Sequence, residues 1–421
     1  MTYSILSLDG GGSRALFEVQ ALIEIYGKDI HGRELLTDFD LVAANSGGSV
    51  VLGCLLEDLT LEQILGFLKS QEKLRTIFSP TTRWYRFFNW KFLPHVFPKY
   101  SAGKKLPALE KQLPNTGGKC LNGITSKIVS KRSKKPVHIL MTSFDYDRNR
   151  AVFFRSGETQ RPGWGTGAPA EVTLAQAIHA SANPPVLYFD GPAEIAGTRG
   201  TPTHRYWDGG LAGCNNPVLA AVTEAIGKQA SIEDIIVLSL GSAVTALPDL
   251  PPGQPPSPLF SKPRRSAWLG DITNAAEAIL DDPPDIATFL AHVMISTGNE
   301  LRPHQENNVE SRVVRMNPLF SPVKKSGEWS PPGDLTLDQL ELLIGLNLDA
   351  IAKQEVDAVV HYAELWIKDK APNQPIRANG KSLHPEIGQS NFTHALAVWK
   401  KLSYPFNGDK TDTRRAESSD S

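Results

Sequence analysis

The sequence is poor in cysteine, and Cys54, Cys120 and Cys214, its only three cysteines, lie far apart. This spacing excludes a disulfide framework and a cysteine-based zinc site, so we expect a reducing compartment. No run of about 18 apolar residues occurs, which argues against a membrane-spanning helix. The N-terminus has no basic stretch before its first apolar run, so a secretory signal peptide is not expected. These absences predict a cytoplasmic protein.

An excess of charge of either sign is also missing. The 421 residues include 44 Lys and Arg and 45 Asp and Glu, for a net charge of −1. This balance excludes a uniformly basic nucleic-acid coat, and we expect no nucleic-acid partner. Hydrophobic residues make up 41% of the chain, enough for a sizeable core, which excludes global disorder.

The N-terminal pattern is strand, glycine turn, helix, and it occurs twice. The apolar run Tyr3–Leu8 precedes three glycines and a helical pattern over Arg14–Tyr26. A second apolar run, Phe39–Ala44, precedes a serine–glycine turn and a helical pattern over Ser49–Glu57. This order indicates α/β architecture with a parallel sheet. Further strands are expected at Val137–Thr142, Val152–Arg155, His204–Trp207 and Ile235–Leu240, and further helices at Leu61–Gln71, Leu174–Ser181 and Pro217–Gly227.

The chain changes character after Gly241. Seven prolines lie between Pro248 and Pro263, which predicts an extended connection. Three helical patterns follow, over Ala267–Leu280, Asp285–Ser296 and Leu337–Trp366. We therefore expect a catalytic core over 1–245, a proline-rich loop over 246–265, a helical C-terminal portion over 266–407 packed on the core, and a disordered tail over 408–421.

The first turn, Gly10-Gly11-Gly12-Ser13-Arg14, joins a strand to a helix. Glycines permit close approach of the backbone, and the N–H groups at a helix N-terminus bind anions. The turn fits an oxyanion hole, and it also fits a dinucleotide-binding turn or a plain tight turn. A dinucleotide site needs an acid at the end of the second strand, but that strand ends in a serine turn. The oxyanion hole is the favoured interpretation.

The second turn, Ala44-Asn45-Ser46-Gly47-Gly48, differs from Gly-x-Ser-x-Gly by one methyl group. A nucleophile elbow needs small residues two positions either side of the serine, because the sharp turn brings them together. Ala44 and Gly48 meet this need. The N–H of Gly47, next after the serine, is placed to donate to an oxyanion. Ser46 is therefore the candidate nucleophile.

A serine nucleophile needs a base within hydrogen-bond reach. The third motif, Asp208-Gly209-Gly210, places an acid at the end of an expected strand. Because strand ends of one polarity meet at one edge of an open sheet, we expect Asp208 near Ser46. Histidine is the alternative base, and the candidates are His179, on an apolar helix face, and His304, in a polar loop.

Together the three motifs resemble the patatin-like phospholipases, in particular bacterial ones. Their pattern is Asp-Gly-Gly-Gly-x-Arg, then Gly-x-Ser-x-Gly, then Asp-Gly-Gly or Asp-Gly-Ala. This sequence carries Asp9–Arg14, then Ala44–Gly48 with alanine in the first position, then Asp208–Gly210. Additional similar segments, in the same order, are Ala180–Pro185 with Phe189, Asn215–Pro217 and Leu238–Ser242.

The resemblance implies a three-layer patatin-like α/β fold with a mostly parallel central sheet, here with a helical C-terminal extension. It implies a Ser–Asp dyad with Ser46 as nucleophile and Asp208 as base, and an oxyanion hole around Gly10, Gly11, Gly12 and Arg14. The implied reaction is hydrolysis of glycerolipid acyl esters without calcium. No His, Cys, Asp and Glu cluster in the sequence has the spacing of metal ligands, so we expect no metal and no other cofactor. A nucleotide-binding module and a catalytically silent anion-binding scaffold remain as alternatives.

One segment is strongly basic. Residues 73–143 contain fifteen Lys and Arg and one acid, Glu110, and nine aromatic residues lie within Phe78–Tyr100. Basic and aromatic side chains favour a charged bilayer surface, so we expect peripheral contact with the inner face of the membrane during activity. A solvated basic face is the alternative. The candidate contacts are Trp84, Trp90, Lys127, Lys131 and Arg132.

A basic pocket would also suit a nucleotide. Some bacterial patatin-like phospholipases are anti-phage effectors activated by cyclic nucleotides, so the resemblance makes a cyclic nucleotide a candidate activator. The sequence leaves the oligomeric state and the head-group preference open.

Overall fold

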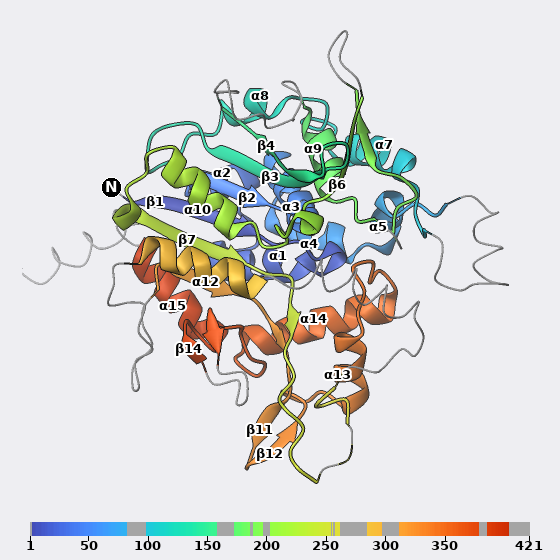
Figure 1. The fold of residues 1–421 in the computed structure, drawn as a ribbon, viewed down its shortest axis with the longest axis vertical. Coiled ribbons are helices and arrows are strands. Elements are labelled where there is room, and N and C mark those ends of the chain that lie inside the picture. The colour runs from blue at the N-terminus through green and yellow to red at the C-terminus, as the bar shows by residue number, and fades with distance from the viewer. Residues whose placement is uncertain are drawn as a thin grey trace, which may run out of the picture.

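A computed structural model describes residues 2–81, 98–157, 172–185, 188–196, 203–253, 255, 257–261, 284–296, 311–378 and 385–403. An eight-stranded sheet crosses its centre in the order β5-β6-β3-β2-β1-β7-β9, and β4 also pairs with β3 (Figure 1). The strands are β1 Tyr3–Leu8, β2 Leu41–Ala44, β3 His138–Asp145, β4 Arg150–Arg155, β5 Ala193–Ile195, β6 His204–Asp208, β7 Ile235–Leu240 and β9 Val313–Met316.

The middle of the sheet is parallel. β1 pairs in parallel with β2 and β7, β2 with β3, and β7 with β9. The antiparallel pairs β3–β4, β3–β6 and β5–β6 lie on one side. The predicted α/β class with a mostly parallel sheet is confirmed, and β6 is antiparallel to the strand that precedes the serine turn.

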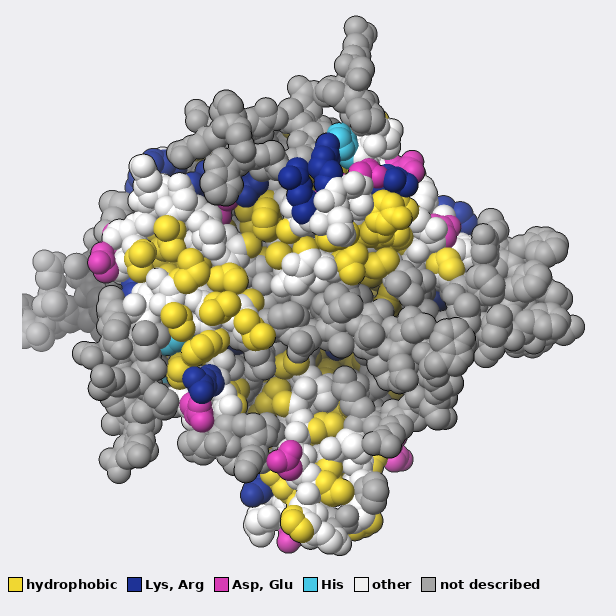
Figure 2. Space-filling view, in the orientation of Figure 1, with side chains coloured by type: hydrophobic (Ala, Val, Ile, Leu, Met, Phe, Trp, Pro, Cys, Tyr) yellow, Lys and Arg dark blue, Asp and Glu magenta, His cyan; other side chains and the backbone are white. Residues whose placement is uncertain are grey.

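Helices cover both faces of the sheet, because residues of the inner strands alternate between two apolar cores. Ile5 and Val237 face a core that contains residues of α10 (Val218–Gly227) and α12 (Pro284–Ile295). Hydrophobic side chains gather over these two helices in Figure 2. Ile286 and Leu290 of α12 are exposed. The opposite core contains Leu6, Leu8 and residues of α1 (Leu16–Tyr26), α3 (Ser46–Leu56) and α4 (Leu61–Lys69). The result is three layers.

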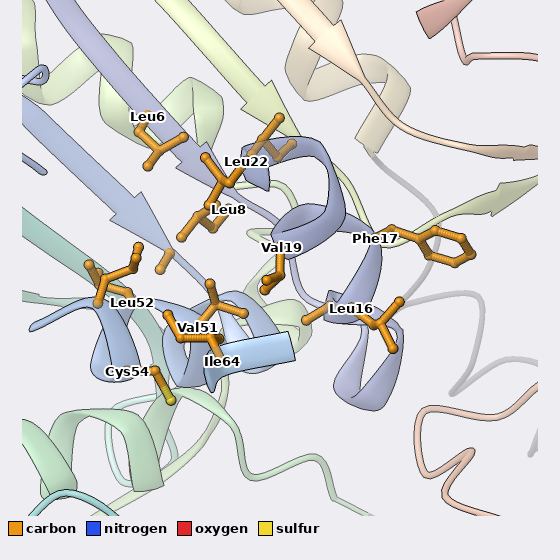
Figure 3. Close-up of a cluster of buried hydrophobic side chains, with 14 of the residues drawn as sticks. Leu6, Leu8, Leu16, Phe17, Val19, Leu22, Val51, Leu52, Cys54 and Ile64 are labelled. Carbon is orange, nitrogen blue, oxygen red and sulfur yellow. The ribbon is translucent and has the colours of Figure 1, made fainter. Parts of the chain in front are cut away.

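Helix α1 is buried on two sides. Val19 and Leu22 lie toward β1, whereas Phe17 points away from that cluster (Figure 3). The Phe17 ring lies 6.0 Å from that of Phe320 and 6.4 Å from that of Trp366, both in the C-terminal part of the chain. Aromatic rings in edge-on contact stabilise a core beyond the area that they bury. These contacts attach the C-terminal part to the core.

The C-terminal part is helical, but it also supplies strands. β9 is the edge strand of the central sheet, so residues 1–245 do not contain the whole sheet. The helix predicted over Leu337–Trp366 is broken, with α13 over Leu337–Ile344 and α14 over Lys353–Ile367. The remaining elements are α15 Phe392–Ser403 and short strands β8 Val244–Thr245, β10 Leu319–Phe320, β11 Val323–Lys325, β12 Glu328–Ser330, β13 Arg377–Ala378 and β14 Pro385–Ile387.

Three predicted elements match the structure in full, namely Tyr3–Leu8, Ile235–Leu240 and α9 over Leu174–Ser181. The helix predicted from Ser49 begins three residues earlier, at Ser46. The helix predicted over Leu61–Gln71 ends at Lys69, because Ser70 caps a new helix, α5, by accepting from the Lys73 N–H. The other helical elements are α2 Gly32–Leu36, α5 Gln71–Ile77, α7 Ala102–Gln112, α8 Leu121–Thr125 and the 3₁₀ turns η1 Gly12–Ala15, η2 Gly209–Ala212 and η3 Ile232–Asp234.

The helix predicted over Ala267–Leu280 and the tail 408–421 lie outside the described residues. Within the described ranges, every helix is too short or too polar to cross a bilayer.

Candidate active site

Ser46 stands at a sharp turn between β2 and α3. Its φ is 47°, in the left-handed region that a serine rarely adopts. A side chain at Gly48 would come within 2.6 Å of the Leu8 carbonyl oxygen, so only glycine fits this turn. Ala44 is accommodated as a regular strand residue, paired with Leu8 and Met141. The backbone geometry is that of a nucleophile elbow.

Two glycines bring free N–H groups beside the serine. A Cβ on Gly47 would lie 2.5 Å from the Gly12 carbonyl oxygen and 2.9 Å from the Gly12 nitrogen, so the two turns touch. No acceptor among the described residues takes the N–H of Gly12 or of Gly47. Both residues line a cavity together with Ser46. Their positions make them the candidates for the predicted oxyanion donors.

The other predicted oxyanion residues have different tasks. Gly10 was predicted to lie around the oxyanion hole, but its N–H donates to the Asn215 carbonyl at 2.7 Å and is not available to an oxyanion in this structure. The Arg14 N–H likewise donates to the Gly11 carbonyl at 3.1 Å, and the Arg14 side chain is buried. A side chain at Gly11 would collide with the Ser242 hydroxyl. These residues shape the turn.

Asp208 ends β6 and is buried. Because β6 runs antiparallel to β3, and β3 parallel to β2, Asp208 does not reach the site by the predicted convergence of parallel strand ends. Register explains its position instead. Asp208 pairs with Ser143, two residues beyond Met141, which pairs with Ala44. The last residue of β6 therefore stops at the level of the serine turn.

Asn45 links the two motifs. Its Nδ2 donates to Asp208 Oδ1 at 3.2 Å and to Asn215 Oδ1 at 3.3 Å, and its Oδ1 accepts from the Thr142 hydroxyl at 2.7 Å. A Cβ on Gly209 would collide with the Asn45 and Thr142 side chains, and Gly210 donates its N–H to Asp208 Oδ1 at 2.8 Å. Packing therefore requires glycine at position 209, and the N–H of Gly210 holds the Asp208 carboxylate.

Opposing effects act on the Asp208 carboxylate. Burial raises its pKa, while the N–H of Gly210 and the side chains of Ser46, Asn45 and Lys105 lower it. Asp208 Oδ2 accepts no hydrogen bond with good geometry from any described residue. The carboxylate therefore has one oxygen fixed by the protein and one oxygen available as a proton acceptor. The Ser46 hydroxyl is close enough to the carboxylate to lower its pKa.

The cavity beside Ser46 is mainly apolar and partly open, and the empty space of about 480 Å³ at this place includes open solvent. Besides Gly12, Ser46 and Gly47, the residues that line it are Ser13, Val50, Leu68, Leu74, Ile77, Phe78, Lys105, Ala182, Pro184 and Leu348. Leu348 comes from the connection between α13 and α14. An apolar cavity with a few polar groups at one end suits a ligand with a hydrocarbon chain and a polar reacting group.

Neither histidine that was considered as an alternative base is found beside Ser46 in the described structure. His179 is buried in α9, does not line the cavity, and burial lowers its pKa to about 3. His304 lies outside the described residues. Within the described part of the chain, no group of three or more His, Cys, Asp and Glu side chains is arranged to hold a metal ion.

The predicted membrane contacts separate into three groups. Trp84 and Trp90 lie outside the described residues. Lys127 is exposed, and Lys131 is paired with Asp38 at 2.7 Å. Arg132 is only 2% exposed, and its Nε donates to the Asp38 carbonyl at 3.0 Å. The prediction of Arg132 as a surface contact is wrong, because its guanidinium is used inside the protein.

Sequence reasoning missed four residues that support the site. The Ser181 hydroxyl accepts from the Ser46 N–H at 3.1 Å, and Thr142 holds Asn45. Arg315 of β9 donates to Asp9, beneath the glycine turn, at 2.6 Å. Lys105 is buried and lines the cavity. Only Ser181 lies in a motif-like segment, so pattern alone could have indicated only that residue.

The family model described as patatin-like phospholipase matches residues 6–222 of the chain. No curated protein matches the chain. Among solved structures, the chain is similar to VipD from Legionella pneumophila, with 10% identity, 86% of this chain and 67% of VipD covered, and a TM-score of 0.33.

It is also similar to human GIVD cytosolic phospholipase A2, with 11% identity, 96% of this chain covered and a TM-score of 0.40. The alignment covers 60% of that protein's length. The family match, in contrast, spans more than half of this chain and includes the glycine turn, Ser46 and Asp208. On that match, the chain belongs to the patatin-like phospholipase family.

Proposed function

We propose that the protein is a phospholipase A type acyl hydrolase that uses Ser46 and Asp208 as a catalytic dyad on glycerophospholipid esters. The observation that carries the proposal is the left-handed turn at Ser46, which sets this residue in an apolar cavity beside a buried carboxylate. Membership of the family supports lipid as the substrate.

In this mechanism the Ser46 oxygen attacks the ester carbonyl while its proton passes to Asp208. The negative charge on the carbonyl oxygen is stabilised by the N–H groups of Gly12 and Gly47. The tetrahedral intermediate expels the alcohol, which takes the proton from Asp208, and an acyl-Ser46 ester remains. Water then attacks this ester, Asp208 accepts the proton of the water and returns it to Ser46, and the fatty acid leaves.

Fixed geometry compensates for a weak base. A carboxylate has little driving force to remove a serine proton, since its ordinary pKa is ~3.9. Burial raises the pKa of Asp208 and improves it as a base, and Asn45 and Gly210 hold it in place. Oxyanion donors contribute about 3–4 kcal/mol each in comparable sites.

The test is acyl release from phosphatidylcholine vesicles by wild type and by Ser46→Ala, Asp208→Asn and the double variant. Each single variant should lose hydrolysis, and the double variant should be no worse, because the two residues act as a unit. His179→Gln is the matched control and should keep activity. Wild-type turnover by a folded Ser46→Ala protein would refute the dyad. Labelling by a fluorophosphonate should also require Ser46.

The proposed chemistry uses protein groups alone, so hydrolysis of a soluble short-chain ester should continue in excess EDTA. A calcium requirement on that ester would contradict the mechanism, whereas one seen only on vesicles would concern the lipid surface.

We further propose peripheral membrane contact through the exposed lysines that follow α8. Lys127, Lys134 and Lys135 are exposed in that loop. Reversing all three to glutamate should weaken binding to anionic vesicles and leave soluble-ester hydrolysis unchanged, with the exposed Lys368 and Lys370 reversed as the control. Binding should fall as salt rises, because charges are screened beyond ~8 Å at physiological ionic strength. Salt-insensitive binding would refute this contact.

The cyclic-nucleotide proposal, with its role in antiviral defence, is tested in the same vesicle assay. It requires wild type to be nearly inactive until a cyclic nucleotide is added. Full activity without one refutes it. Tight nucleotide binding with no esterase activity would favour a nucleotide-binding module, and vesicle binding that survives Ser46→Ala in an inactive protein would favour a scaffold.

A further inference from the structure

Lys105 is a lysine in the protein interior. It lies on α7, is 1% exposed, and lines the same cavity as Ser46. Its Nζ donates to the Ala182 carbonyl and, at 3.5 Å, to the His179 carbonyl, both at the C-terminal end of α9. It also lies 4.4 Å from the centre of the Phe189 ring. Lysine is rarely buried so fully without a carboxylate partner, and within the described residues no carboxylate forms an ion pair with it.

The segment that Lys105 holds accepts hydrogen bonds from the backbone N–H groups of both members of the proposed dyad. Ser181 accepts the Ser46 N–H at 3.1 Å through its hydroxyl. Asn183 accepts the Asp208 N–H at 3.1 Å through its carbonyl. Ala182, between these two residues, is the acceptor for Lys105. The ammonium therefore fixes the middle of a three-residue segment whose ends hold the backbones of nucleophile and base.

Lys105 and Asp208 donate hydrogen bonds to the carbonyls of adjacent residues, Ala182 and Asn183, so the positively charged ammonium lies in the neighbourhood of the Asp208 carboxylate. This charge lowers the pKa of Asp208, and the carboxylate in turn opposes the effect of burial, which lowers the pKa of Lys105 to about 7. The other titratable groups nearby are His179 on α9, whose pKa of about 3 leaves it neutral, and Asp190, which accepts the Ala102 N–H at the start of α7. Each member of the Lys105–Asp208 pair thus favours the charged form of the other.

We propose that Lys105 is a positioning residue for the dyad, which keeps Asp208 ionised as the base and fixes residues 181–183 beneath Ser46. The proposal rests on the proposed function, because it assigns Asp208 the role of base. Lys105 forms no bond to substrate in this scheme and acts through Asp208 and the end of α9.

The activity test compares wild type with Lys105→Met and Lys105→Gln, using kcat/KM on a soluble uncharged ester from about pH 5 to about pH 9. Lys105→Met should move the acidic limb up by about one pH unit or more, because a nearby cation no longer favours the carboxylate. Its deficit should therefore be large at low pH and shrink above about pH 8, where the wild-type lysine is also neutral. Lys105→Gln keeps a donor for Ala182, so it should show the same shift with a smaller deficit at high pH.

The neighbouring Lys104 provides the control. It is exposed and donates to the Pro80 carbonyl at 3.3 Å, so Lys104→Met should leave the profile unchanged. A deficit of Lys105→Met that is equal at every pH, with no shift in either variant, would overturn the proposal and leave Lys105 a packing residue.

A second measurement needs neither activity nor a Lys105 variant. In protein labelled with carbon-13 at lysine Cε, the Lys105 signal should titrate near pH 7, and Asp208→Asn should move that titration to lower pH. An unchanged titration would refute the coupling even in an active enzyme. If the coupling is present but wild type hydrolyses no ester, the proposed function fails, and the assignment of Lys105 to catalysis fails with it.

Discussion

Replacement of Asn45 by aspartate tests how far the site depends on one side chain. Asn45 is fully buried, and its amide nitrogen donates to both Asp208 and Asn215. Asn45→Asp keeps the shape and keeps the acceptor for the Thr142 hydroxyl. It replaces the donor with an oxygen that faces the Asp208 carboxylate and the side-chain Oδ1 of Asn215.

The expected loss in the free energy of unfolding follows from these contacts. Two acceptors lose their donor, and each buried polar group left without a partner costs about 1–3 kcal/mol. We expect a loss of about 2–6 kcal/mol from a typical total stability of about 5–15 kcal/mol. The new carboxylate is buried beside another, so its folded-state pKa lies above its unfolded value. The destabilisation should therefore grow as pH rises through the unfolded value toward the folded one, and fade in acid.

The assays are urea unfolding and ester hydrolysis at several pH values. Thr142→Val is the control, because it removes the one hydrogen bond that Asn45 Oδ1 accepts from Thr142; it should cost about 1–3 kcal/mol while keeping measurable turnover. Asn45→Asp should lose nearly all hydrolysis even where it remains folded, since the base is no longer held and its pKa rises further. Wild-type turnover in folded Asn45→Asp would refute the view that Asn45 positions Asp208.

Two further predictions concern the glycine turn. Arg315→Met leaves the buried Asp9 without its cation and should cost about 3–5 kcal/mol by urea unfolding where Asp9 is ionised. Burial raises the pKa of Asp9 to about 6 even with Arg315 present, and loss of Arg315 raises it further. The destabilisation should therefore shrink as pH falls toward 6 and stay constant in more acidic solution. Gly12→Ala should reduce hydrolysis strongly, because φ is +59° and the new Cβ would collide with the Leu348 carbonyl. Gly103→Ala in α7, where a Cβ meets nothing within 4 Å, should gain up to about 1 kcal/mol by the same unfolding assay.

The sequence predicted the centre of the site because each motif is local. A glycine turn, a serine turn and an acid before two glycines each leave a mark within a few adjacent residues, so Ser46 and Asp208 could be named without coordinates. The path of β6 could not be predicted, since alternation and turn residues do not give strand direction. Asp208 was placed near Ser46 for the wrong reason, and its register with β3 gives the right one.

Supporting residues escaped prediction because their roles come from contacts between distant elements. Lys105 and Arg132 both lie in a strongly basic segment, and charge alone predicted solvent or a membrane for them. Unlike the exposed lysines beside them, these two side chains are buried. Lys105 donates to the Ala182 carbonyl at the end of α9, and Arg132 donates to the Asp38 carbonyl. Hydrophobic spacing also predicted one helix over Leu337–Trp366, although its interruption is what brings Leu348 to the cavity.

The break between α13 and α14 also contributes to the glycine turn before α1. The family match ends at residue 222, yet the turn is held by groups that follow it. The Ser242 hydroxyl donates to the Gly10 carbonyl at 2.6 Å, and Ser13 donates its N–H to the Leu348 carbonyl at 3.0 Å and its hydroxyl to the Ala350 carbonyl at 2.9 Å.

Arg315 holds Asp9 from below, on a strand that completes the central sheet. The turn that precedes α1 is therefore fixed on several sides by Ser242, Arg315, Leu348 and Ala350, and no acceptor in the described part of the chain takes the Gly12 N–H. A glycine-rich loop would otherwise sample many conformations. In the mechanism that we propose, the C-terminal part therefore supports catalysis, because the conformation of the proposed oxyanion donors depends on it.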